Sequence, residues 1–155
     1  MLQVPKCFTV DLMHLGFINL GELLIPLWCG AIQCDATDNK ATWDWATLVG
    51  QTWIKHGKLI AATTKYFPSL FHHPPQNPTE KISSGFKATE YYLYLFGLGP
   101  AFFRMILPRK YWRNFCKLVY GFRIIMQRKV VGYQLQEGYI ALTSFIEEYE
   151  NLYYQ

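Results

Sequence analysis

The sequence contains few cysteines and lacks a recognisable secretory signal. Its 155 residues include four cysteines, Cys7, Cys29, Cys34 and Cys116. These are too few and too scattered for a disulfide scaffold in a chain of this length. The first residues do not show the charged, apolar and small-residue parts of a signal peptide. We therefore expect an intracellular protein whose thiols are reduced.

An uninterrupted apolar run of membrane-spanning length is also missing. The most apolar segment, Leu15 to Ile32, contains Glu22 and Pro26. A charged side chain at the middle of a bilayer costs roughly 3 kcal/mol, and a spanning helix needs about 20 apolar residues. We expect no membrane contact. The segment is predicted to be a buried helix with Asp11 as its N-cap and Gly30 as its stop, bent or ended early by Pro26.

Motifs for phosphate binding and covalent catalysis are absent as well. The GLGP segment, residues 97–100, lacks the lysine of a Walker motif, and no nucleophile elbow occurs. Cys29 and Cys34 with His72 and His73 suggest a zinc site, but the cysteine spacing lies at the edge of known patterns and adjacent histidines on an extended chain point in different directions. We expect no metal and no cofactor on this chain.

The sequence is rich in apolar residues, which make up 51% of the chain, and in aromatic residues, which make up 17%. This composition predicts one helical domain over residues 1–155, opened by a short N-terminal segment, 1–10. Four prolines predict a long internal loop over residues 68–85 without helix. Helical spacing recurs elsewhere and period-two alternation does not, so we predict a mainly α fold. We expect an irregular bundle of about five helices with little or no sheet, the helices lying near 11–30, 42–63, 87–96, 109–128 and 133–153.

The two last helices are predicted to pair. The helix 109–128 carries an apolar stripe of Trp112, Phe115, Val119, Phe122 and Met126, and the helix 133–153 carries a stripe of Leu135, Tyr139, Leu142, Ile146, Tyr149 and Tyr153. The short VVGY connection favours an antiparallel pair whose two stripes face each other.

The charges of these two helices have opposite signs. Eight basic and no acidic residues occur from Arg104 to Lys129, whereas the last helix has four glutamates and no lysine or arginine. The basic side of the first helix consists of Arg109, Lys110, Arg113, Lys117 and Arg128. Two interpretations stay open: the charges only assist packing of the pair, or the basic side contacts phosphates.

Asp11 and His14 form the one local acid and histidine pair of interest. Three residues apart, they lie on the same side of one helical turn, so a hydrogen bond between carboxylate and imidazole is expected. An N-cap next to a packed histidine explains the pair without any function.

The order of seven segments resembles the transposases of CACTA (En/Spm-type) DNA elements, particularly the long versions of fungal genomes. These segments are DLMH, LLIPLW, TWDWATLVG, TWIKHGKLI, FKATEYYLYLFGLGP, ILPRKYWRNFCKLVYGFRI and FIEEYENLYYQ. The similarity extends from about residue 9 to the end. The part from KATEYYLYLFGLGP onward also resembles the plant branch of the family.

The resemblance implies a helical insertion in an enzyme of the RNase H-like type. In that family three carboxylates hold two divalent ions, Mg or Mn, for attack on a phosphate. Asp11 and His14 match the family's Asp-x-x-His motif, which implies a supporting place at the rim of the nuclease site. The three carboxylates would precede Met1 or follow Gln155. The chain is therefore expected to be a catalytically inactive fragment, located in the nucleus.

The sequence favours two alternative functions for this chain. The chain binds DNA without sequence preference through Arg109, Lys110, Arg113 and Lys117, or it is a helical protein-interaction or self-associating module that uses exposed aromatic surface.

Overall fold

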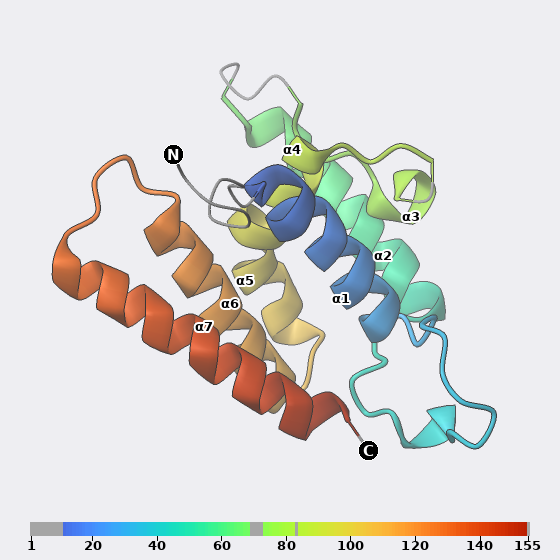
Figure 1. Cartoon of the computed structure of the whole chain (residues 1–155). Helices are drawn as coiled ribbons and strands as arrows, with labels where there is room; N and C mark the ends of the chain where they lie inside the picture. Colours follow the sequence, from blue (N-terminus) through green and yellow to red (C-terminus); the bar gives the residue numbers. More distant parts are fainter. Residues whose placement is uncertain (1–10, 69–72, 83, 155) are drawn as a thin grey trace.

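The computed structural model describes residues 11–68, 73–82 and 84–154, and within these residues the chain is helical without strands. The helices are α1 (Leu20–Trp28), α2 (Gly50–Ala62), α3 (Pro78–Lys81), α4 (Ala88–Tyr91), α5 (Gly99–Phe102), α6 (Arg109–Ile125) and α7 (Gly132–Tyr153). Two π-helical segments, Met13–Asn19 and Tyr92–Leu98, precede α1 and α5. The predicted mainly α fold is confirmed (Figure 1).

The first helical stretch begins and ends as predicted. The Asp11 carboxylate accepts hydrogen bonds from the backbone amides of Met13 at 2.9 Å and His14 at 3.2 Å. Gly30 has φ 65°, and the amide of the next residue, Ala31, bonds back to the carbonyl of Pro26 at 2.8 Å. A left-handed glycine closes a helix in this way at little cost. Pro26 lies within α1 and does not end it.

The helix predicted from residue 42 starts eight residues later. Asn39 caps a single 3₁₀ turn, Lys40–Thr42, and α2 starts only at Gly50. In the connection between them, Trp45 is buried against Tyr111 of α6. The helical spacing of apolar residues that begins at Trp45 therefore does not mark a helix there. The local preference for helix is weak, and tertiary packing places the Trp45 side chain in the core from an irregular segment.

The proline-rich segment contains a helix that was not predicted. Pro78 occupies the first turn of α3, where a missing amide proton costs nothing, and the Asn77 side chain accepts from the amide of Thr79 at 3.1 Å. Gly57 of α2 allows the Asn77 and Thr79 side chains to approach closely. Residues 69–72 and 83 of the predicted loop lie outside the described residues, as does the N-terminal segment 1–10.

The helix predicted to end at residue 96 instead continues through the GLGP segment. The backbone stays right-handed helical from α4 through Tyr92–Leu98 into α5, with Pro100 in the first turn of α5. Gly99 lies against Phe115 and Phe103, where a Cβ atom would lie 2.9 Å from the Phe115 ring. Close packing therefore requires a glycine at this point, and the helix accommodates it.

Aromatic rings fill the core where these helices meet. Trp28 of α1 contacts Phe103 and Phe115 at centroid distances of 4.8 and 5.2 Å. Its indole N–H donates to the Tyr153 hydroxyl of α7 at 3.0 Å. Rings from α1, α6 and α7 thus meet in one core.

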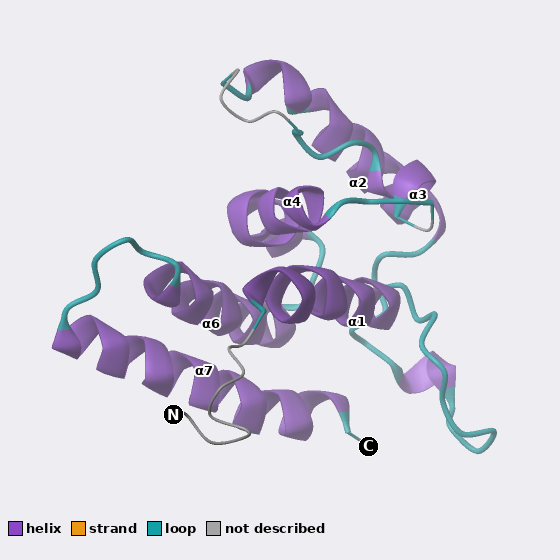
Figure 2. Ribbon diagram, turned by 45° about the horizontal axis from the view of Figure 1, so that its top comes forward, coloured by secondary structure: helices purple, strands orange, loops and turns teal. Residues whose placement is uncertain are grey.

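Helices α6 and α7 form the predicted antiparallel pair (Figures 1 and 2). The side-chain amide of Asn114 donates to the carbonyl of Phe145 at 2.9 Å. Further along, Gly138 lies against Ile124, so increasing numbers on one helix meet decreasing numbers on the other. Gly138 and Phe145 are the buried residues of α7.

The predicted stripe of α7 is therefore wrong in part. Leu142 packs against Gly121 of α6, but Leu135, Tyr139 and Ile146 are 57%, 71% and 55% exposed. The buried line of α7 instead runs through Gly138 and Phe145, and Gly138 packs against Ile124 of α6.

In the part of the chain that the structure describes, no helix is both long and apolar enough to cross a bilayer.

Candidate nucleic-acid interface

Asp11 and His14 make the predicted contact on the surface. The His14 Nδ1 atom lies 2.5 Å from the Asp11 Oδ2 atom, and the two side chains are 61% and 57% exposed. The hydrogen bond with His14 lowers the pKa of Asp11, helped by the backbone amides it caps. The described structure thus shows a helix cap with a paired imidazole, and it brings no further carboxylate to them in a metal-binding group.

The cysteine and histidine set considered for zinc is not brought together in the described residues. Cys29 is half-buried, and burial raises the pKa of its thiol to about 11, whereas Cys34 is exposed. A raised pKa disfavours the thiolate that metal ligation needs. His72 lies outside the described residues, and no group of three or more potential ligands occurs among those described.

The basic side of α6 is present but partly neutralised. Arg109 and Arg113 are exposed, and their spacing of four puts them on one face. Lys110 and Lys117 flank this face and are both ion-paired. The first turn of α6 contains no acidic residue.

Asp44 reaches Lys110 from the connection before α2. The Lys110 Nζ atom lies 2.8 Å from the Asp44 Oδ2 atom, and the Tyr111 hydroxyl donates to the other carboxylate oxygen. Burial alone would raise the pKa of Asp44, but the hydrogen bonds from Lys110 and Tyr111 outweigh it and lower the pKa. This acid is 67 residues from Tyr111 in the chain, so the acid-free run of the sequence does not make an acid-free surface.

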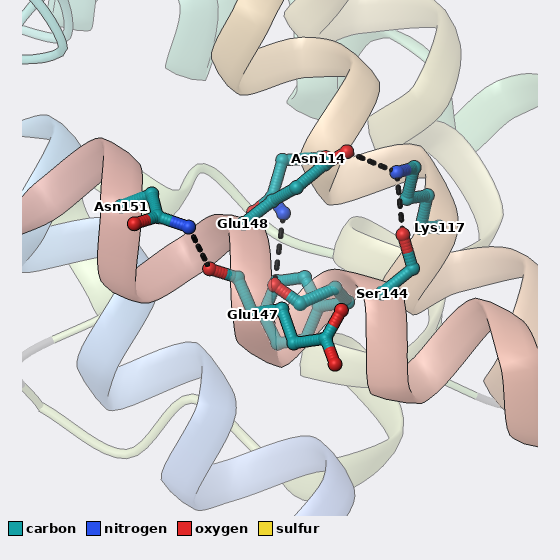
Figure 3. Close-up of polar contacts among 7 residues, drawn as sticks. Asn114, Lys117, Ser144, Glu147, Glu148 and Asn151 are labelled. Carbon is teal, nitrogen blue, oxygen red and sulfur yellow. Dashed lines mark hydrogen bonds and ion pairs between the residues drawn. The ribbon is translucent and has the colours of Figure 1, made fainter.

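Glu148 of α7 pairs with Lys117 in the same manner (Figure 3). The Lys117 ammonium also donates to the Ser144 hydroxyl at 2.7 Å. The hydrogen bond from Lys117 lowers the pKa of Glu148, against a small effect of burial. Lys117 therefore helps to join α6 to α7, which is the packing role considered for the charges.

A surface cleft follows this ion pair between the two helices. It has a volume of about 550 Å³, and its lining includes Lys110, Arg113, Lys117 and Glu148. Its lining has three cations and one carboxylate, and Asp44 also pairs with Lys110, so one positive charge remains in excess. An anion of phosphate size would find cationic partners there.

Arg104 is a cation that the sequence reasoning did not single out. Its guanidinium lies 5.6 Å from the centroid of the Trp112 ring, and Arg104, Arg109 and Trp112 line a second surface cavity of about 340 Å³. The run of basic residues without an acidic one begins at Arg104, and this could have included Arg104 in the predicted basic surface. Arg104 thus extends the basic side beyond the N-terminal end of α6.

The remaining basic residues of the run have other positions. Arg123 donates to the carbonyl of Phe96 at 2.7 and 3.2 Å and so joins α6 to the preceding helical segment. Arg128, predicted to share the face of Arg109, lies beyond the end of α6 at Ile125 and is exposed in the connection to α7. It is therefore not part of the face formed by Arg109 and Arg113.

His56 is buried in the core. Its Nε2 atom lies 2.8 Å from the Tyr94 hydroxyl, and its ring lies between Trp53 and Phe103 at centroid distances of 6.0 and 5.1 Å. Burial lowers the pKa of His56 to about 4, so the imidazole is neutral at pH 7. We interpret it as a core residue.

Comparison with known proteins finds no matching family model, no matching curated protein and no matching solved structure.

Proposed function

We propose that this chain is a non-catalytic helical part of a CACTA-type DNA transposase, and that it contacts DNA phosphates through the N-terminal half of α6. The order of the seven sequence segments supports the transposase origin. The Asp11 and His14 contact is compatible with a place at the rim of a nuclease site. Metal-dependent cleavage is not assigned to these residues, because the resemblance matches none of them to the family's three metal-binding carboxylates.

The observation that carries the DNA contact is the arrangement of Arg104, Arg109 and Arg113. All three are exposed, and Arg104 and Arg109 line one cavity. Arginine guanidinium groups suit phosphate oxygens because they donate in a planar fork. Contacts of this kind bind DNA without reading its sequence.

The experiment is a titration of fluorescently labelled duplex DNA with the protein at increasing salt. Three phosphate contacts predict a slope of log affinity against log salt of about −2.7, so affinity falls roughly 40-fold from about 50 to about 200 mM salt. Replacing Arg104, Arg109 and Arg113 with alanine should abolish most of this dependence.

The matched control removes the same charge elsewhere. Lys55, Lys58 and Lys81 are exposed and belong to α2 and α3, so their replacement with alanine should change binding little. Asp44→Asn, which frees Lys110, should strengthen binding at low salt. Equal losses in the arginine and lysine variants would show an effect of net charge alone and would contradict the proposed surface.

A second function is supported by a different observation, the exposed apolar side chains of α7. Apolar surface of this kind on a folded domain often marks a protein-binding site. We propose on this ground that the chain is a protein-interaction module. At dilutions where the protein is monomeric, a hydrophobic dye should bind it, and the signal should fall when Leu135, Tyr139 and Ile146 are replaced with glutamine. A native monomer without dye binding would contradict this second function.

A further inference from the structure

An exposed apolar stripe of α7 lies beside the contact with α6, which runs from Glu137 to Tyr153. Leu135, Tyr139 and Ile146 follow one another at spacings of four and seven, so they share one face of the helix. Helix α6 packs against α7 at Gly138, Leu142 and Phe145, which lie to one side of this face. Each of the three side chains is more than half exposed.

The apolar surface continues from α7 onto α1. A groove of about 160 Å³ lies between the two helices, and it is lined by Leu20 and Leu23 from α1 and by Ile146 and Tyr149 from α7. Leu23 is 44% exposed, and Tyr154 at the end of the groove is 76% exposed. The extension makes the apolar surface wider than the stripe of α7 alone.

Charges along α7 are distributed unevenly. Glu147, Glu148 and Glu150 lie in its C-terminal half, and the connection that precedes its N-terminus carries Arg128 and Lys129. The one glutamate of the N-terminal half, Glu137, accepts a hydrogen bond from the Tyr120 hydroxyl of α6. Both of these basic residues are exposed. The two ends of the helix therefore differ in sign.

We infer that the stripe is the contact surface for a second copy of this chain, with the two α7 helices antiparallel about a two-fold axis. An antiparallel pair brings the acidic half of each helix toward the end where Arg128 and Lys129 of the other copy lie. A parallel pair would set Glu150 beside Glu150, and like charges in contact are unfavourable. A two-fold interface uses the same patch twice, and a stripe of Leu, Tyr and Ile can face itself. This inference rests on the second function proposed above.

The direct test is the mass of the full chain in solution, measured by light scattering after gel filtration and by sedimentation over a range of concentrations. A concentration-dependent dimer is expected. Replacing Leu135, Tyr139 and Ile146 with glutamine should weaken dimerisation at least tenfold, about 1.4 kcal/mol. Because these side chains are exposed, the variant should remain folded.

Tyr133→Gln with Ile140→Gln is the matched control. These residues are 67% and 57% exposed on the same helix, but they point roughly 130° away from the stripe at about 100° per residue. The control variant should dimerise like the original protein. Equal weakening of both variants would show non-specific apolar association and would overturn the inference.

The orientation has its own test by exchange of charge. Replacing Arg128 and Lys129 with glutamate should weaken the dimer at low salt, and adding Glu147→Lys and Glu150→Lys to the same chain should restore it. Failure of the restoration would overturn the antiparallel arrangement. A protein that stays monomeric at all concentrations would overturn the inference that a second copy binds the stripe. If that monomer still bound the hydrophobic dye through the stripe, the proposed interaction function would stand.

Discussion

Asn114 on α6 donates a hydrogen bond to the backbone carbonyl of Phe145 on α7 at 2.9 Å, and both residues are buried. The bond joins two helices across 31 residues of sequence. A buried amide of this kind fixes the register of a helix pair, because any sliding would leave it without a partner.

Replacing Asn114 with leucine should lower the free energy of unfolding by about 1 to 3 kcal/mol, since the hydrogen bond is lost and the site is shaped for an amide. The measurement is urea unfolding followed by circular dichroism. Asn151→Leu is the control: the Asn151 amide also donates to a backbone carbonyl, that of Glu147, but on its own helix and in an exposed position (Figure 3). A loss at Asn151 as large as at Asn114 would contradict the role given to the inter-helix bond.

Gly121→Ala should destabilise the same helix pair by overpacking. A Cβ atom at Gly121 would lie 2.5 Å from the Leu142 Cγ atom, and extra atoms in a packed contact typically cost about 1 to 3 kcal/mol. Gly132→Ala, where nothing lies within 4 Å, should be neutral or stabilise by up to about 1 kcal/mol through helix propensity. Thermal unfolding of both variants distinguishes crowding from a general effect of alanine.

His56 should make the protein less stable in mild acid. The pKa of His56 falls from 6.5 to about 4 on folding because of burial, so the unfolded chain binds a proton between these values and the folded protein does not. The free energy of unfolding therefore includes the full contribution of the neutral imidazole above about pH 6.5. This contribution, up to about 3 kcal/mol, is lost as the pH falls toward 4.

The measurement is urea unfolding of the original protein and of His56→Gln at pH 7 and pH 5. The difference in unfolding free energy between the two pH values should shrink in the variant. The carboxylates of Asp11, Asp44 and Glu148 have pKa values lowered from 3.8 for the aspartates and 4.5 for the glutamate. Their contribution is therefore lost mainly below those ordinary values and changes little between pH 7 and pH 5. An unchanged pH dependence in His56→Gln would remove His56 as its cause.

Local signals in the sequence were sufficient for several features. The Asp11 cap, the Gly30 stop and the antiparallel pairing of α6 and α7 follow from residue type and spacing over one or two helical turns. The contact between Asp11 and His14 was predictable for the same reason. In each case the interacting groups are close in the chain, or are joined by a short connection.

Only the tertiary structure decided which surfaces are free. Asp44 and Glu148 come from distant segments to neutralise Lys110 and Lys117, and Trp45 enters the core from an irregular connection where a helix was predicted. Helix α7 packs on α6 through Gly138, while Leu135 and Tyr139 stay exposed. The sequence by itself determined the helices and their ends, because capping and periodicity act between neighbours. Which charges are paired and which apolar side chains are covered depended on contacts across the fold, which no local pattern encodes.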